Sequence, residues 1–316
     1  MELCVAIPGE RGVTWSDWHA LAAACEEHGI PALYSSDHYG SLPAAGRPVL
    51  DAWGVMCALA AVTTTLRLGV VVSPASVRHP SVLAKLAVTA DRISGGRVDL
   101  GMGAGWHEEE HLAFGLRFPD LGTRLDILEE QAEIVRGLLG PRPFSFAGRH
   151  YAYAAADARP KPAGLRIIIG GAAGPRSAGI AARWADEYNT GGIDPDGCRR
   201  RRERLDAACE AVGRDPHSLH LSFETWLLLG RDEAELRDRA AAAAAAEGDP
   251  SRAPSDLLRE ARASDYWIVG TPADAAEQLA GLADAGVERV LLLPPSPWDA
   301  GQIGLIAREL APLLGT

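Results

Sequence analysis

The chain has 316 residues, of which 47% are hydrophobic and 23% charged, and its formal net charge at pH 7 is −11. No apolar run is long enough to span a membrane, and the acidic balance disfavours nucleic acids and anionic membranes as partners. No basic, apolar leader precedes the first strand-like segment, and the five cysteines form no CxxC pair. We therefore expect a cytoplasmic enzyme or binding protein with reduced thiols.

Eight strand-like runs alternate with amphipathic helical segments along the chain. The predicted strands cover residues 3–7, 32–35, 68–72, 98–102, 166–169, 187–190, 219–226 and 289–293. Alternating β and α segments of this length favour a parallel sheet, and eight of them fit a closed barrel. The sequence thus predicts one α/β domain over residues 1–316, a (β/α)8 TIM barrel with insertions at its C-terminal face.

Two segments interrupt the alternation and are predicted insertions. Residues 140–164 contain several prolines and a hairpin-like alternation, and we expect them to cap the barrel mouth. Residues 232–266 include an alanine-rich stretch of high helix propensity. We expect this second segment to form a mobile lid or an extra helix pair.

Polar or glycine-rich residues follow most predicted strands, on the face where a barrel opens its active site. Asp37 and His38 end the second strand, and Gly103-Ala104-Gly105 ends the fourth. Histidine has an ordinary pKa of about 6.5 and exchanges protons at neutral pH, and a neighbouring carboxylate can hold its tautomer. We therefore predict His38 as the catalytic residue, with Asp37 beside it.

The fifth predicted strand enters a turn of small residues, Gly170–Gly174, which is followed by Pro175 and Ser177. Proline at the first position of a helix leaves the free N–H groups and the positive end of the helix dipole facing the barrel mouth. This pattern predicts a phosphate site at the turn.

The segment His107-Glu108-Glu109-Glu110-His111 matches the H-E-x-x-H pattern of zinc proteases. It begins just after a glycine turn rather than inside a long helix, and no third ligand follows at a fixed spacing. We assign no metal, and a zinc-binding or non-catalytic barrel remains the alternative of another class. The preceding Gly101–Trp106 fails the G-x-G-x-x-G pattern because Trp106 takes the place of the third glycine.

One basic run, Arg199–Arg202 with Arg204, follows Asp194-Pro195-Asp196 at the start of a predicted helix. We interpret it as a solvated helix face rather than an anion site.

A series of short motifs extends over nearly the whole chain. They are Ser36-Asp37-His38, Leu50-Asp51-Ala52-Trp53, Arg67-Leu68-Gly69, Arg78-His79-Pro80, Ser94-Gly95-Gly96-Arg97, Gly103-Ala104-Gly105-Trp106, Phe118-Pro119, Gly148-Arg149-His150-Tyr151, Ile169-Gly170-Gly171, Ala185-Asp186-Glu187 and Val269-Gly270-Thr271-Pro272. Together these motifs resemble the bacterial-luciferase-like superfamily, and within it the deazaflavin-dependent oxidoreductases that use coenzyme F420.

The resemblance implies a barrel mouth that holds a flavin-like ring. Carried onto this chain, Asp37 and His38 would face the ring, and a bulge in the third strand, with a cis peptide near Val71-Val72, would support its back. The other implied cofactor-binding residues are Val71, Val72 and Ser73 at the bulge, Ala104 and Gly105 near the cofactor chain, and Gly171, Ala172, Ala173, Gly174 and Ser177 at the phosphate.

The resemblance also implies the reaction: hydride transfer between F420 and a small organic substrate, with His38 as proton donor or acceptor. An FMN-dependent luciferase-like monooxygenase is the alternative. Members that oxidise sugar phosphates use lysines, whereas this chain has only Lys85 and Lys161, so that reaction is not expected. The resemblance further implies a homodimer, because members of this family associate through the helices near strands two to four.

Overall fold

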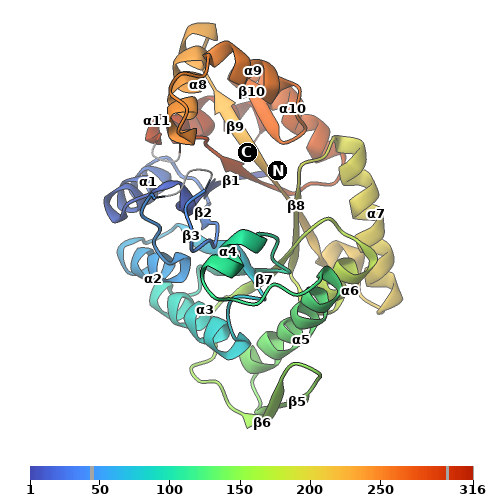
Figure 1. Ribbon diagram of the computed structural model, residues 1–316. Helices are drawn as coiled ribbons and strands as arrows, with labels where there is room; N and C mark the ends of the chain where they lie inside the picture. The colour runs from blue at the N-terminus through green and yellow to red at the C-terminus, as the bar shows by residue number, and fades with distance from the viewer. Residues whose placement is uncertain (43–45, 297–298, 316) are drawn as a thin grey trace.

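The computed structural model describes residues 1–42, 46–296 and 299–315. Within them, parallel strands form a closed barrel in the order β1, β2, β3, β4, β7, β8, β9, β11, and β11 pairs again with β1 (Figure 1). The barrel strands are β1 (Glu2–Ile7), β2 (Ala32–Ser35), β3 (Arg67–Pro74), β4 (Val98–Gly103), β7 (Arg166–Gly170), β8 (Glu187–Gly191), β9 (His220–Leu229) and β11 (Arg289–Leu293). The predicted TIM barrel is confirmed.

Helices surround the barrel (Figure 1). They are α1 (Trp15–Glu27), α2 (Ala52–Val62), α3 (Pro80–Ser94), α4 (Glu108–Ala113), α5 (Leu121–Leu139), α6 (Pro175–Trp184), α7 (Pro195–Ala211), α8 (Glu233–Glu247), α9 (Pro254–Arg262), α10 (Pro272–Asp284) and α11 (Ala300–Leu305), with short helical turns at Gly9–Arg11, Pro216–Ser218, Ile306–Leu310 and Ala311–Leu314. Across the described ranges, no helix is both long and apolar enough to cross a membrane.

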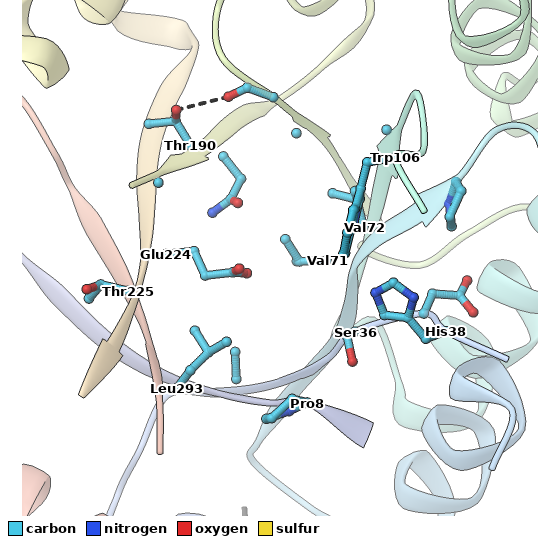
Figure 2. A pocket seen from close by; sticks show the side chains of 18 of the residues that line it. Pro8, Ser36, His38, Val71, Val72, Trp106, Thr190, Glu224, Thr225 and Leu293 are labelled. Carbon is cyan, nitrogen blue, oxygen red and sulfur yellow. Dashed lines mark hydrogen bonds between the residues drawn. The ribbon is translucent and has the colours of Figure 1, made fainter. Parts of the chain in front are cut away.

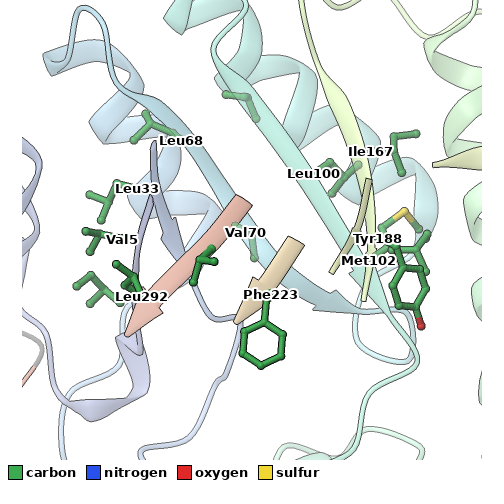
Figure 3. Packing of buried hydrophobic residues seen from close by; sticks show 14 of the residues in the cluster. Val5, Leu33, Leu68, Val70, Leu100, Met102, Ile167, Tyr188, Phe223 and Leu292 are labelled. Atoms are coloured by element: carbon green, nitrogen blue, oxygen red, sulfur yellow. The ribbon is translucent and has the colours of Figure 1, made fainter. Parts of the chain in front are cut away.

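Alternation along the strands separates two apolar layers, since successive side chains point to opposite faces. Outward-facing residues such as Val5, Leu33 and Leu100 pack against the helices in the main core (Figure 3). Inside the barrel, a smaller cluster contains Tyr34 and Ile168. The barrel is therefore filled rather than hollow below its mouth.

An ionic layer closes the opposite, amino-terminal end of the barrel. Asp99 on β4 is fully buried, and its carboxylate contacts Arg67 of β3 and Arg166 of β7 and accepts a hydrogen bond from the Tyr34 hydroxyl at 2.7 Å. Arg289 of β11 lies 3.6 Å from Asp99 and 2.9 Å from Glu187 of β8. Charged side chains from five barrel strands, β3, β4, β7, β8 and β11, thus meet in one layer across the barrel.

The first insertion lies elsewhere than expected. It forms an antiparallel hairpin of β5 (Phe144–Ala147) and β6 (Ala152–Ala156), at the lower edge of Figure 1 beyond α3 and α5. Glu130 of α5 accepts hydrogen bonds from the backbone N–H groups of Arg149, His150 and Tyr151. The hairpin packs on the outside of the helical layer, and none of its residues lines the cavity described below. The prediction that it caps the mouth was wrong.

The second insertion contains the predicted helix pair, α8 and α9. It is followed by a strand that was not predicted from the sequence. This strand, β10 (Trp267–Gly270), pairs with the second half of β9, from Trp226 to Leu229. The first half of β9 pairs with β8 instead. The helix pair and β10 enclose a separate hydrophobic cluster against β9, built from Leu228, Leu236, Ala240, Ala243, Ala244, Leu257, Leu258, Ala261 and Val269.

Candidate active site

A cavity of about 600 Å³ lies at the carboxyl ends of the barrel strands (Figure 2). Strand residues and the loops that follow them line it on every side. Among the predicted site residues, those that line the cavity are Asp37, His38, Val71, Val72, Ala104, Gly105, Gly171 and Ala172. Sequence positions as far apart as 37 and 172 therefore meet at one site, as the barrel topology requires.

The predicted bulge in β3 is confirmed. Between Val70 and Ser73 three steps along β3 face only two steps along β4, from Leu100 to Met102, and the Val71–Val72 peptide is cis. Val71 and Val72 both line the cavity and are labelled at its wall in Figure 2. The bulge therefore provides an apolar surface at the centre of the site.

Glycines on the neighbouring strands make room for this bulge. A Cβ at Gly101 would lie 2.3 Å from the Val70 carbonyl oxygen, and one at Gly103 would lie 2.6 Å from Val72 Cγ2. A Cβ at Gly170 of β7 would lie 2.7 Å from Val72 Cγ1. The glycines of the Gly101–Gly103 segment are therefore explained by close packing against β3 and not by a nucleotide fingerprint.

His38 is held by a carboxylate that the sequence reading did not assign. Its Nδ1 lies 3.0 Å from Glu110 Oε2, and the two side chains are 12% and 6% exposed. The other Glu110 oxygen accepts the backbone N–H groups of Tyr39 at 2.7 Å and Gly40 at 2.9 Å. Glu110 thus fixes the imidazole ring and also the turn that follows β2.

The protonation of this pair follows from these contacts. Burial raises the pKa of Glu110, but hydrogen bonds from His38 and from the backbone of Gly40 outweigh it and lower the pKa to about 2. Burial likewise lowers the pKa of His38, yet the hydrogen bond with Glu110 brings the net pKa above its ordinary value. Glu110 is therefore ionised at neutral pH, and its charge favours the protonated form of the imidazole, whose Nδ1 it occupies.

Asp37 does not hold the tautomer of His38, contrary to expectation. Its Oδ2 accepts a hydrogen bond from the Ser73 hydroxyl at 2.6 Å and contacts the Arg78 guanidinium. Ser73 is fully buried, accepts from Trp53 Nε1 at 2.9 Å and does not line the cavity. Asp37 and Ser73 therefore join the end of β2 to the bulged strand, while Asp37 also borders the site.

The H-E-x-x-H histidines are engaged in local hydrogen bonds. His107 Nδ1 accepts the backbone N–H of Glu110 at 3.0 Å and so caps α4, a helix of only six residues. His111 is 1% exposed, and its ring nitrogens lie 2.7 Å from the His107 carbonyl and 2.7 Å from the Ser76 hydroxyl. In the described part of the chain, no three histidine, cysteine or acidic residues converge on one point.

The small-residue turn after β7 leads into α6 as predicted, but it is only partly open to the cavity. Gly171 and Ala172 line the wall, whereas the Ala173 N–H donates to the Tyr188 hydroxyl at 2.7 Å. Ser177 also bonds this hydroxyl, at 3.0 Å, and Gly174 forms the N-cap of α6. Ala173, Gly174 and Ser177 thus lie behind the lining, and their binding of phosphate remains a prediction.

Three charged residues that line the cavity were missed: Glu10, Arg201 and Glu224. Arg201 of α7 lines the wall and donates to the Thr190 hydroxyl and the Gly191 carbonyl, so the expected solvated helix face is wrong for this residue, whereas Arg199, Arg200 and Arg204 are exposed as expected. Glu224 of β9 points into the cavity opposite His38 (Figure 2). The sequence could have indicated Glu224 as a site residue, because it is the lone acidic residue in an apolar strand. Nothing in the sequence distinguishes Arg201 from the arginines beside it.

These residues fit a flavin-like cofactor. Glycines at positions 103 and 170 keep Val72 exposed as an apolar support for one face of a planar ring, since a Cβ at either position would collide with it. At the side of β8 and α7, Arg201 forms no ion pair with an acidic residue in the described ranges, so it offers a cation for an anionic group. The cavity thus combines an apolar support with a positive site.

The family model described as luciferase-like monooxygenase matches residues 1–289. The chain belongs to this family. The family and the barrel architecture agree with the resemblance seen in the sequence motifs, and the named relatives are oxidoreductases or monooxygenases. We conclude that the protein is an enzyme of the luciferase-like oxidoreductase and monooxygenase type.

Three curated relatives differ in what their names state. The pyrimidine monooxygenase RutA of Stutzerimonas stutzeri is 34% identical over 52% of this chain, and the match spans only 47% of its own length. The F420-dependent glucose-6-phosphate dehydrogenase of Nakamurella multipartita is 27% identical over 93% of this chain and 91% of its own. The FMNH2-dependent dimethylsulfone monooxygenase of Pseudomonas fluorescens is 26% identical over 74% and 70%, respectively.

Among solved structures, an F420-dependent secondary alcohol dehydrogenase in complex with an F420–acetone adduct superposes with a TM-score of 0.81. It is 19% identical and the match covers 99% of both chains, which shows the shared fold. Relatives of both cofactor classes are thus similar to this protein.

Proposed function

We propose that the protein is an F420-dependent oxidoreductase that transfers a hydride between the deazaflavin and a small organic substrate. The observation that carries this proposal is the His38–Glu110 pair at the mouth of the cavity, facing the space above the Val71–Val72 bulge. A hydride transfer to a carbonyl or related group needs a proton donor at the substrate, and an imidazole with a raised pKa and a free Nε2 can meet that need.

F420, when bound, supplies or accepts the hydride. Within the described residues, no hydrogen bond engages His38 Nε2, so this nitrogen is available to the substrate while Nδ1 stays on Glu110. Val71 and Val72 would support the ring, Ala104 and Gly105 would lie along the cofactor chain, and Arg201 would bind its anionic part. The Gly171–Ser177 turn would lie at the phosphate of the cofactor, and Asp37 and Ser73 would hold the surrounding backbone in place.

The relative named as F420-dependent supports this cofactor because its match extends over more than nine-tenths of both chains. The FMN-dependent monooxygenase is the alternative that the test must separate. The purified protein should be titrated with oxidised and reduced F420 and, in parallel, with FMN, and binding followed by fluorescence. Binding of F420 at a much lower concentration than FMN would support the proposal. Tighter binding of FMN would instead indicate an FMN-dependent monooxygenase.

Two variants refine this test. His38→Asn keeps a polar group of similar size, so F420 should still bind, while turnover of any substrate found should fall about 100-fold or more, the usual contribution of a proton donor. Glu109→Gln changes an exposed glutamate beside Glu110 and should leave both properties unchanged. Unaltered turnover in His38→Asn would remove His38 from the mechanism.

A homodimer and cytoplasmic residence remain predictions from the sequence. Support for the dimer comes from α3, on which the exposed side chains of Val82 and Ile93 lie on one helix face. Light scattering after size-exclusion chromatography would give the mass in solution. A mass near 33.4 kDa, that of one chain, would contradict the dimer.

A further inference from the structure

The carboxylate of Glu224 is an unusual feature of the cavity. It lies in β9 between Phe223 and Thr225 and projects into the space opposite His38 (Figure 2). In the described part of the chain, it makes neither a hydrogen bond nor an ion pair through its side chain. Glu224 is partly buried, and a carboxylate withdrawn from water without a partner is costly, so its orientation toward the cavity needs an explanation.

A second carboxylate borders the same space. Glu10, which follows β1, lines the cavity and accepts a hydrogen bond from the Ser36 hydroxyl. The neighbouring Arg11 interacts electrostatically with Glu10, but its ion pair is with Glu247, at 3.9 Å. Its guanidinium lies 4.4 Å from the ring centre of Trp226 and donates to the Pro295 carbonyl at 3.1 Å.

The charges that face Glu224 are therefore few. They are Glu10, from the turn after β1, and His38, from the end of β2. His38 is already paired with Glu110, and Arg201 bonds to Thr190 and Gly191 instead. Burial, together with the nearby Glu10, raises the pKa of Glu224 to about 7. Among the described residues, no cation forms an ion pair with Glu224 or Glu10, and a ligand that brings one would relieve the repulsion between the two acids.

We propose that Glu224 determines substrate specificity and, together with Glu10, selects an organic substrate that carries a protonated amine. An ammonium group donates up to three charge-assisted hydrogen bonds, which suits two carboxylates that border the same cavity. The apolar part of the substrate would pack against Leu293. This inference rests on the proposed function, because it assigns the space between Glu224 and His38 to the substrate.

The test uses three probes of nearly equal size and different charge: benzylamine, benzyl alcohol and benzoate. Their binding to the F420-loaded protein and to the protein without cofactor should be measured by calorimetry. We expect benzylamine to bind about tenfold or more tightly than benzyl alcohol at pH 8, as a charge-assisted hydrogen bond would give. Its affinity should fall between pH 8 and pH 6, because Glu224 becomes protonated while the amine stays charged.

Glu224→Gln removes the charge and keeps the shape, so it should abolish both the amine preference and its pH dependence while benzyl alcohol binding persists. Glu10→Gln should weaken the preference as a second, independent change. Glu203→Gln, on an exposed position of α7, is the matched control and should behave like the unaltered protein. Circular dichroism of each variant checks that it folds.

Equal affinities for the three probes, or a preference that survives in Glu224→Gln, would overturn the inference. The F420 titration separates this outcome from failure of the proposed function. If F420 binds but the amine preference is absent, only the specificity role of Glu224 fails. If the amine binds through Glu224 but F420 does not, the cofactor assignment fails instead.

Discussion

His38 and Glu110 form the contact on which the chemistry of the site depends, and it can be tested by titration. Replacing Glu110 with glutamine removes the negative charge, so the pKa of His38 should fall toward its ordinary value of 6.5. NMR titration of the histidine ring signals would measure this change, with His38→Asn used to assign the resonance. The exposed Glu109→Gln is the control. An identical His38 titration in both variants would show that Glu110 does not set the charge of the imidazole.

The sequence was sufficient to predict His38 but not its partner. His38 stands at a strand end, which the alternation of β and α segments locates directly. Glu110 lies 72 positions away in a row of three glutamates, and only α4 determines which of them faces His38. The adjacent Asp37 was the expected partner, but Ser73 and Arg78 bind its carboxylate instead. Local sequence proximity was therefore misleading.

The bulge of β3 is the element that gives the cavity its apolar surface, and Gly101 of β4 is the position that it constrains most directly. In Gly101→Ala the new Cβ would meet the backbone of Val70 and Val71, which cannot move as a side-chain end can. We expect a loss of about 1–3 kcal/mol in the free energy of unfolding, the usual cost of overpacking. Urea denaturation would measure it.

Gly179→Ala provides the control of opposite sign. Gly179 lies inside α6, and its added Cβ would have only the end of the Arg183 side chain nearby, at 3.5 Å. Since alanine is favoured over glycine in a helix by up to about 1 kcal/mol, this variant should be equal to or more stable than the original protein. If Gly101→Ala were as stable as Gly179→Ala, the bulge would not depend on the missing side chain.

Strand and helix positions followed from periodicity, whereas the placement of the insertions did not. All eight barrel strands were predicted within a few residues because strand-like and helix-like segments alternate regularly along the chain. β10 has four residues and follows an alanine-rich segment, so no run of sufficient length marked it. The β5–β6 hairpin was recognised, but its packing against α5 depends on hydrogen bonds to Glu130 that no local pattern reveals.

At the scale of the whole molecule, the ionic layer around Asp99 joins strands from both halves of the chain. Asp99→Asn leaves the arginines Arg67, Arg166 and Arg289 without their shared carboxylate. Unpairing a buried charge network of this kind costs about 3 kcal/mol or more. Thermal or urea unfolding at pH 7 should therefore show a large loss of stability.

The same carboxylate predicts part of the acid sensitivity of the protein. Burial raises the pKa of Asp99, but hydrogen bonds from Arg166 and Arg67 outweigh it and lower the pKa from 3.8 to about 2. A group whose pKa is lowered by folding stabilises the folded state above its ordinary pKa and loses this contribution as the pH falls. The stability difference between the original protein and Asp99→Asn should thus shrink between about pH 4 and pH 2, and a constant difference would contradict the assignment.

The separate hydrophobic cluster of α8, α9 and β10 has a consequence for how this enzyme could acquire new substrates. Trp226 and Tyr266 border the cavity on the side of this cluster. Trp267 packs against the cluster and stacks on Trp226, with 5.6 Å between the ring centroids. The bulge, which we propose supports the cofactor, belongs to another wall, in β3. Substitutions in the cluster can therefore change the shape of one wall of the cavity while the packing of the bulge stays the same. The substrate range of the enzyme can thus evolve independently of its reactivity.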